Sequence, residues 1–197
     1  KNLRTLQIRN FYSIKLPNSI ENLTGLADFR FIIQNTIHLP TSIKNLQNLE
    51  KFQIKSSLSQ FPEFIFNFKN LTLLSLRRNS LTSIPKSFGD NLQNLKVLDL
   101  YENDLSSLPQ SIKNLSKLTH INIAYNNFTT IPENIKFKYL KNLQSIDISY
   151  NPFVSLETFK YLFSNPNLTI KSDFTSSANY KLTIDGLNIP EKVKDLW

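Results

Sequence analysis

Large apolar residues return along the chain at a nearly constant interval. Each unit begins at a leucine that is followed by apolar residues three and five positions later, as Leu95 is followed by Leu98 and Leu100. An apolar pair separated by one position has the period of a β-strand with one buried face, so each unit predicts a short strand. Seven such units start 22 to 25 residues apart, at Leu3, Leu26, Leu49, Leu71, Leu95, Leu118 and Leu143.

A second apolar signal follows the predicted strand in each of the first six units. It is an apolar residue joined to proline, with another apolar residue three positions after the proline. Proline fixes φ and lacks a backbone donor, so it suits the first turn of a helix. The spacing predicts one helical turn that packs inward. The prolines are Pro17, Pro40, Pro62, Pro85, Pro109 and Pro132.

One unit alone cannot bury its apolar side, so the units are expected to stack into a solenoid with parallel strands and one continuous core. Residues 1–156 are expected to form about seven coils. Residues 157–197 depart from the pattern and are expected to be a degenerate last repeat and C-terminal cap. Within them, Leu156 to Phe163 predicts a longer amphipathic helix, and two short strands are expected after residue 167.

Asparagine occupies the ninth place of the last four units, and its amide is expected to satisfy backbone groups where the strand bends into the loop. The first three units carry other residues there, so those coils are expected to be less regular. Because the chain has only three glycines, asparagine and proline are the expected turn formers. The asparagines are Asn79, Asn103, Asn126 and Asn151, and the earlier residues are Phe11, Gln34 and Ser57.

The full spacing, L-x-x-L-x-L-x-x-N-x-L-x-x-L-P-x-x-I-x-x-L, resembles the leucine-rich-repeat superfamily. It is most similar to the 23-residue class with Leu-Pro and Ile on the convex side, as in bacterial and Ras-group-like members, and Leu95 to Leu115 is the cleanest copy. The resemblance covers about residues 1–156. It implies an α/β horseshoe arc with a parallel sheet on the concave face and short helical or 3-10 turns on the convex face. It implies no particular partner, because the superfamily binds diverse ones.

The composition removes most catalytic chemistries. The chain has no cysteine, which excludes disulfides, thiolate zinc sites and thiol nucleophiles within it. His38 and His120 lie in different units and lack ligand partners at helical spacing, so no metal site is expected. Asp99, His120 and Asp147 fall on neighbouring outward positions near Ser75, but an open sheet offers no oxyanion hole and excludes no water. We therefore expect no enzymatic activity and no cofactor.

Charge is unevenly distributed along the chain. Residues 1–98 hold 13 Lys and Arg against 5 Asp and Glu, whereas residues 99–197 hold 10 of each. A pI near 9.6 permits nucleic-acid binding. That alternative is weakened by the neutral second half, by acidic residues on the same sheet, and by the lack of aromatics among the basic residues. A third alternative is a structural spacer or surface-coat element of a longer protein, because no N-terminal cap precedes the first unit.

Residues two, four and six positions after each start are expected to point outward from the concave sheet. Arginine and tyrosine are the residue types most enriched at binding hot spots, and a surface with both signs of charge orients a partner. The simpler interpretation is that Tyr125 and Tyr150 only stack across strands and that the charges only keep the face wet. The predicted partner-binding residues are Arg30, Lys55, Arg77, Arg78, Asp99, Tyr101, Glu102, His120, Tyr125, Asp147 and Tyr150.

These observations favour a non-catalytic protein–protein interaction module that binds an unidentified protein through its concave face. No run of 18 apolar residues occurs, so membrane insertion is not expected. We expect a monomer and a secreted or cell-surface location rather than a cytoplasmic one, in a bacterial protein that acts on a host or neighbour. Five N-x-S/T sequons are weak evidence for glycosylation in a chain so rich in asparagine. They begin at Asn22, Asn70, Asn114, Asn127 and Asn167.

Overall fold

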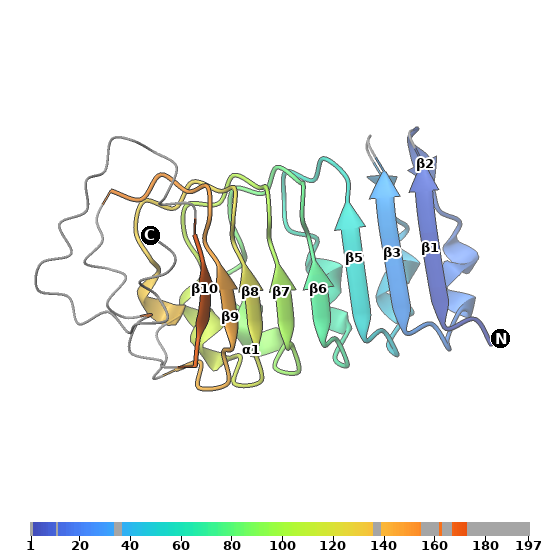
Figure 1. The fold of residues 1–197 in the computed structure, drawn as a ribbon. Coiled ribbons are helices and arrows are strands. Elements are labelled where there is room, and N and C mark those ends of the chain that lie inside the picture. Colours follow the sequence, from blue (N-terminus) through green and yellow to red (C-terminus); the bar gives the residue numbers. More distant parts are fainter. Residues whose placement is uncertain are drawn as a thin grey trace, which may run out of the picture.

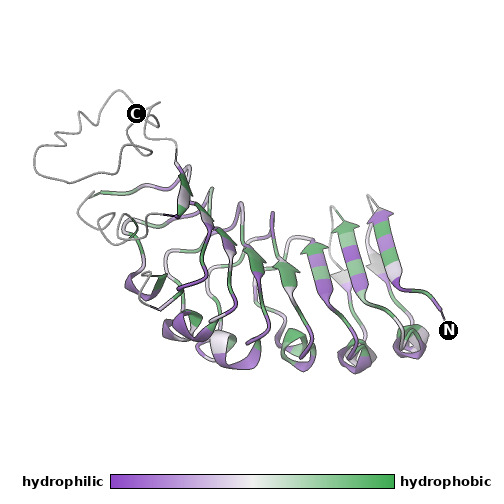
Figure 2. Ribbon diagram, turned by 60° about the horizontal axis from the view of Figure 1, so that its bottom comes forward, coloured by the Kyte–Doolittle hydropathy of each residue, from purple (hydrophilic) through white to green (hydrophobic). Residues whose placement is uncertain are grey.

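The structure is a computed structural model that describes residues 2–10, 12–33, 37–135, 139–154, 162 and 167–172. Eight parallel strands form one sheet in the order β1-β3-β5-β6-β7-β8-β9-β10, and β2 pairs with β4 in a second, two-stranded sheet (Figure 1). The large sheet lies on the inner side of a curved solenoid and the short helices lie on its outer side (Figure 2). This architecture confirms the predicted horseshoe with a parallel concave sheet.

Each coil contributes one strand to the large sheet, and we number coils 1 to 7 from the seven leucines that start them. The strands are β1 (Thr5–Asn10), β3 (Asp28–Ile33), β5 (Lys51–Lys55), β6 (Leu73–Ser75), β7 (Val97–Asp99), β8 (His120–Asn122), β9 (Ser145–Asp147) and β10 (Thr169–Lys171). The two-stranded sheet consists of β2 (Ile14–Lys15) and β4 (Ile37–His38). The helical segments are η1 (Asn18–Asn22), η2 (Thr41–Asn45), η3 (Glu63–Asn67), α1 (Phe88–Asn91), η4 (Gln110–Asn114) and η5 (Glu133–Ile135).

The strands pair in register, because the apolar residue three places after each start lies beside its counterpart in the next coil. Phe52 of β5 pairs with Leu74 of β6, and Leu74 pairs with Leu98 of β7. The side chains of these residues are almost completely buried. A shift by one residue would turn every apolar side chain of a strand to the solvent, so the buried pattern fixes this register.

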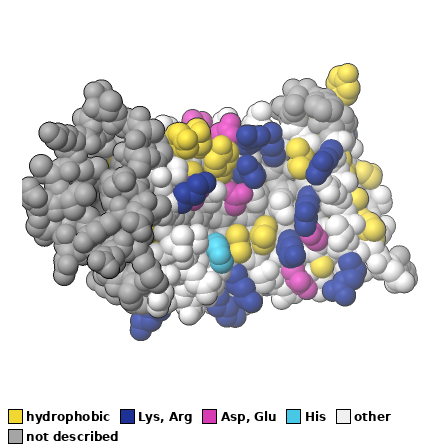
Figure 3. All heavy atoms as spheres, in the orientation of Figure 1, with side chains coloured by type: hydrophobic (Ala, Val, Ile, Leu, Met, Phe, Trp, Pro, Cys, Tyr) yellow, Lys and Arg dark blue, Asp and Glu magenta, His cyan; other side chains and the backbone are white. Residues whose placement is uncertain are grey.

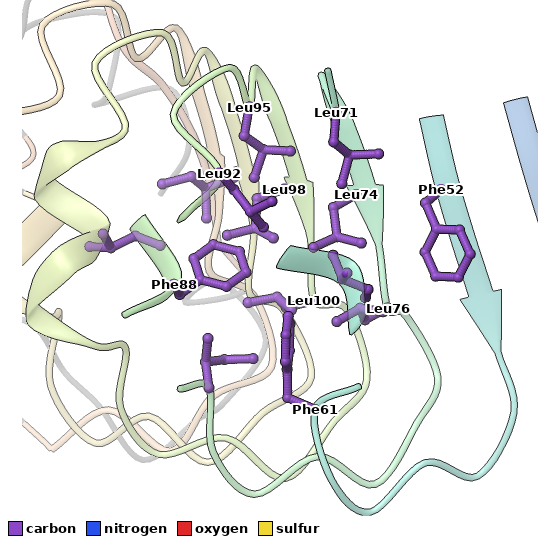
Figure 4. Close-up of a cluster of buried hydrophobic side chains, with 14 of the residues drawn as sticks. Phe52, Phe61, Leu71, Leu74, Leu76, Phe88, Leu92, Leu95, Leu98 and Leu100 are labelled. Atoms are coloured by element: carbon purple, nitrogen blue, oxygen red, sulfur yellow. The ribbon is translucent and has the colours of Figure 1, made fainter. Parts of the chain in front are cut away.

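The core is one continuous apolar column between the sheet and the helical turns. Figure 4 shows Leu98 and Leu100 from the sheet side and Phe88 and Leu92 from the helical side, all directed into the same space. The proline signal works as predicted: Pro109, in extended conformation, precedes η4, its carbonyl accepts from the Ile112 N–H at 3.0 Å, and Ile112 is buried.

The asparagine ladder satisfies backbone groups as predicted. The Asn103 Oδ1 accepts from the Leu81 N–H of the preceding coil at 3.1 Å. Its Nδ2 donates to the carbonyls of Leu76 and Leu100, both at 3.0 Å. The amide therefore joins two coils and closes its own turn, and Asn79, Asn126 and Asn151 make corresponding bonds.

The expectation that asparagine and proline form the tight turns is wrong at the strand ends. Among the described non-glycine residues, positive φ occurs immediately before each of these four asparagines, at φ values of 54 to 56°. A left-handed residue at this place exposes its own side chain and turns the next one inward, where the buried amide is needed. The four residues are Arg78, Glu102, Tyr125 and Tyr150.

The first three coils differ from the later four. Their strands β1, β3 and β5 are 6, 6 and 5 residues long, whereas β6 to β9 have 3 residues each. Ser57, which replaces the asparagine in coil 3, is exposed. Phe11 and Gln34, the corresponding residues of coils 1 and 2, lie outside the described residues. The strands of the large sheet therefore shorten between coil 3 and coil 4.

The described part of the C-terminal region adds one strand to the sheet. β10 pairs with β9 through Ile170 and Ile146, which confirms the first of the two strands predicted after residue 167. The predicted helix over Leu156 to Phe163 and the second predicted strand fall outside the described residues, apart from Leu162, which is buried in a helical conformation. Among the described helices, none has the length and apolarity needed to cross a membrane.

Candidate binding face

Polar and aromatic side chains cover the concave face, as the alternation along the strands predicts. Figure 3 views this face and shows Lys and Arg side chains gathered over the middle and N-terminal strands. Hydrophobic side chains lie beside this basic group towards the C-terminal coils, near the top of the view. The face is therefore divided into a basic part and an aromatic part that meet near coils 4 and 5.

Three tyrosines from consecutive coils form a ladder at this edge. The Tyr101 and Tyr125 rings have centroids 5.1 Å apart at 61°, and the Tyr125 and Tyr150 rings stack at 4.0 Å and 22°. Tyr125 and Tyr150 nevertheless keep 40% and 51% of their surface exposed. The stacking fixes the rings without removing them from solvent. We call these three residues the tyrosine ladder.

Two arginines of coil 4 continue the ladder towards the N-terminus. The Arg77 guanidinium lies 5.0 Å from the Tyr101 ring centroid and that of Arg78 lies 5.9 Å from it. The Arg78 Nε also donates to the Glu102 Oε2 at 2.7 Å. This hydrogen bond, together with the carboxylate charge, raises the pKa of Arg78 and keeps it cationic. Arg77, Arg78, Tyr101 and Glu102 thus form one contiguous cluster.

Two hollows lie beside this cluster, and residues of coils 3 and 4 contribute to the lining of both. The first has a volume of about 330 Å³ and is lined by Ile32, Lys55, Arg77 and Arg78 together with Phe31, Gln53, Ile54 and Ser75. The second, of about 290 Å³, is lined by Lys55, Ser57, Arg78, Asn79, Ser80 and Glu102. Lys55 and Arg78 border both hollows. We call the first one the basic hollow.

The two predicted aspartates hold the ends of their strands. The Asp99 Oδ1 accepts from the Tyr101 N–H at 3.1 Å, and its Oδ2 accepts from the Ser75 hydroxyl at 2.9 Å. The Asp147 Oδ1 accepts from both the N–H and the hydroxyl of Ser149, at 3.1 and 2.7 Å. The Asp147 Oδ2 pairs with Lys171 at 3.0 Å, which raises the pKa of that lysine. Much of the hydrogen-bonding capacity of both carboxylates is already used within the protein.

Arg30 is likewise paired within its own strand. Its Nε donates to the Asp28 Oδ1 at 2.9 Å, and a terminal guanidinium nitrogen donates to Oδ2 at 2.6 Å. This two-point contact raises the pKa of Arg30. The structure therefore groups Lys55, Arg77 and Arg78 around the basic hollow, while the charge of Arg30 is balanced locally by Asp28.

The hydrogen bonds of a Ser-His-Asp triad are not assembled on the described sheet. The His120 Nδ1 lies 2.8 Å from the Thr119 hydroxyl, and the Ser75 hydroxyl donates directly to Asp99. Over the same residues, no group of three His, Asp or Glu side chains is placed to hold a metal ion. His120 is exposed on β8.

The basic hollow and the left-handed strand ends were not found from the sequence. The signal for both was present, because asparagine first occupies the ninth place of a unit in coil 4 and the interval from Leu49 to Leu71 is the shortest, at 22 residues. Both observations mark the junction of coils 3 and 4. They do not give the side chains that line the hollow.

The sequence profile of the family described as "Leucine rich repeat" matches residues 69–128. The mouse volume-regulated anion channel subunit LRRC8B is 32% identical over 158 residues, which are 77% of this chain and 20% of that protein. The chain thus spans about a fifth of the length of this relative.

Solved structures of repeat proteins resemble this solenoid. A leucine-rich-repeat protein of Leptospira interrogans is similar with a TM-score of 0.59 and 28% identity, over 79% of this chain and 45% of that one. The PEPR1–AtPEP1 crystal structure is similar with a TM-score of 0.62 and 28% identity, over 83% of this chain and 25% of that one.

Proposed function

This chain is a leucine-rich-repeat protein, and we propose that it is a non-catalytic module that binds another protein through its concave face. Repeats of this family are typically protein–protein interaction domains and are generally non-catalytic. The partner-binding residues that we propose lie mainly in coils 4 to 7, with Lys55 of coil 3 beside them.

The tyrosine ladder is the observation that carries this proposal. Tyr125 and Tyr150 expose large parts of their rings, although each is held by a stacked neighbour and by the left-handed backbone beneath it. Rigid aromatic side chains lose little conformational entropy on binding and provide a large contact area. A ladder fixed in this way is suited to be the centre of a protein interface.

The charges around the ladder support a protein partner. Arg77 and Arg78 lie against Tyr101 at one end, and Glu102 accepts from Arg78 beside them. Arginine next to tyrosine is a combination enriched at binding hot spots. Charges of both signs around an aromatic centre orient a partner and weaken the binding of wrong ones.

We also propose that the protein is a secreted or surface protein of a bacterium and meets a host or neighbouring cell as a monomer. The similarity to the Leptospira repeat protein supports a bacterial source. Detection of the chain in culture medium or on the surface of its source cells, rather than in their cytoplasm, would test the location.

The binding proposal is tested by a pull-down from host-cell and source-cell extracts, with mass spectrometry of the captured proteins. The wild type is compared with a Tyr101→Ala/Tyr125→Ala variant and with Tyr139→Ala. Tyr139 is a matched control, because its 39% exposed fraction is close to the 40% of Tyr125 but its ring lies beside Lys113 of η4 on the convex side. We expect a protein that the wild type and Tyr139→Ala capture and that the double variant loses. Capture of that protein by all three would contradict the concave site.

A further inference from the structure

The basic hollow is a concave site whose charge is all of one sign. Three of its lining residues are cationic (Lys55, Arg77 and Arg78), and none is acidic. Its volume of about 330 Å³ is at the lower end of the range for pockets that enclose small ligands. A hollow of this size accommodates one or two side chains of a partner rather than a folded element.

The contact between coils 3 and 4 beside the hollow differs from the contact between coils 4 and 5. Between coils 4 and 5, the Arg78 N–H donates to the Tyr101 carbonyl at 2.8 Å, which joins the backbones of the two coils directly. The equivalent N–H of coil 3, that of Ser56, donates to the side-chain Oδ1 of Asn79 at 3.0 Å. The side chain of Asn79 thus bridges the two coils at the point where Arg78 turns the backbone of coil 4 into the left-handed region.

Two of the three cations have their charge available for a ligand. Within the part of the chain that the structure describes, neither Lys55 nor Arg77 forms an ion pair with an acidic side chain. Lys55 is half-buried and Arg77 is exposed, so a ligand in solution can reach both side chains. An anion that enters the hollow accepts charge-assisted hydrogen bonds from these cations.

The surroundings of the hollow indicate what carries the anion. Ile32, 37% exposed, contributes an apolar wall, and Arg77 connects the hollow directly to Tyr101 and so to the tyrosine ladder. From β5 to β9 there are four strand intervals, about 19 Å at about 4.8 Å each, which six residues of extended peptide cover. A peptide across the strands would therefore reach the hollow and Tyr150 at the same time.

We propose that the basic hollow binds the carboxylate side chain of an acidic segment in a protein partner, with the adjoining residues of that segment lying on the tyrosine ladder. This inference rests on the proposed function and adds to it the chemistry of the ligand. A nucleic-acid strand fits the face less well, since Glu102 and Asp99 lie beside the cations and would repel a continuous line of phosphates.

The test begins with selection of binders from a displayed library of random 12-residue peptides, at about physiological salt. Selected peptides are synthesised with a fluorescent label, and their affinity is measured by anisotropy for the wild type, Lys55→Met, Arg77→Gln and the double variant. Lys51→Met is the matched control, because Lys51 lies on the same strand but lines neither hollow. Lys55→Met leaves the Arg77–Tyr101 contact intact, and thermal melting checks that each variant is folded.

We expect the selected peptides to share an Asp or Glu, and we expect Asp→Asn or Glu→Gln in the peptide to weaken binding to the wild type about tenfold. The same peptide change should weaken binding to the Lys55→Met/Arg77→Gln variant less than about twofold. The peptide change and the protein change each remove the same contact between the carboxylate and the cations, so their effects do not add. Lys51→Met should bind like the wild type, and added salt should weaken binding to the wild type.

The inference is overturned if no peptide is selected or if the selected peptides lack acidic residues. It is also overturned if Asp→Asn or Glu→Gln in the peptide weakens binding to the double variant as much as it weakens binding to the wild type. It is also overturned if a 20-nucleotide single-stranded DNA or inorganic phosphate competes as well as the acidic peptide. Non-acidic peptides that are lost with Tyr125→Ala would reject the hollow and leave the proposed function standing. Peptides whose binding is unchanged by both Tyr125→Ala and Tyr150→Ala would count against the proposed function as well.

Discussion

Tyr125 and Tyr150 stack with ring centroids 4.0 Å apart, and both have left-handed backbone conformations, at φ values of 55 and 54°. The two residues occupy the same place in successive coils, so the spacing of the solenoid brings their rings together. A purely structural pair would be expected to bury its rings, but these remain 40% and 51% exposed. The contact between them orders an exposed aromatic surface, which is why we assign it to binding.

Replacing Leu100 by alanine should destabilise the protein by about 2–5 kcal/mol. The Leu100 side chain is fully buried in the core between β7 and the helical turns. Because each coil contacts only its neighbours, the loss is expected to unravel the stack locally around coil 5. Urea unfolding monitored by circular dichroism measures the loss. An unchanged midpoint would contradict the placement of Leu100 in the core.

Replacing Asn103 by alanine should cost about 1–3 kcal/mol, since it leaves the buried Leu81 N–H without its side-chain acceptor and removes one of the two asparagine donors from the Leu76 and Leu100 carbonyls. Asn127→Ala is the control, because Asn127 is exposed and its change should alter stability by less than about 0.5 kcal/mol. Both values come from the same urea titration. Similar losses of stability for Asn103→Ala and Asn127→Ala would contradict the role of the Asn103 amide in joining two coils.

Replacing Gly89 by alanine should destabilise the protein by about 3 kcal/mol or more, although alanine normally favours a helix by about 1 kcal/mol over glycine. A Cβ at Gly89 would lie 1.8 Å from the Ser111 carbonyl oxygen, so α1 and η4 would have to separate. The exposed residue Lys86 provides the control. Equal melting temperatures for Gly89→Ala and Lys86→Ala would show that the two coils are not in close contact there.

Replacing Glu102 by glycine should leave stability unchanged or raise it by up to about 1 kcal/mol, because glycine adopts positive φ without strain. The ion pair with Arg78 that is lost is exposed and contributes little. Asp104→Gly, at an exposed position with ordinary φ, should instead lower stability by about 0.5–1 kcal/mol. A loss in Glu102→Gly as large as that in Asp104→Gly would contradict the left-handed turn.

The sequence was sufficient for the strands, their register and the buried side of each coil. Leu74 and Leu98 could be placed in the core because a strict period-two pattern inside a repeat of about 23 residues allows one way to bury every leucine. The role of Asn103 could be predicted for a similar reason, since a polar residue that returns once per coil needs a recurring backbone partner.

Features that depend on contacts between particular coils could not be read in this way. The close approach of Gly89 to Ser111 depends on how far apart α1 and η4 lie, which no local pattern encodes. Asp99 looked like a free surface charge, but its carboxylate accepts from Ser75 in the preceding coil. The basic hollow is lined by residues of three successive coils, and no single strand predicts it.

The most direct test of concave binding is site-specific photo-crosslinking with p-benzoylphenylalanine in place of Tyr125 or, separately, Tyr139. The two tyrosines are 40% and 39% exposed and lie on opposite sides of the solenoid, so the label is equally accessible in both proteins. We predict that the protein captured in the pull-down becomes covalently linked at position 125 and not at position 139. Crosslinking at position 139 without crosslinking at position 125 would place the partner on the convex side and contradict the account.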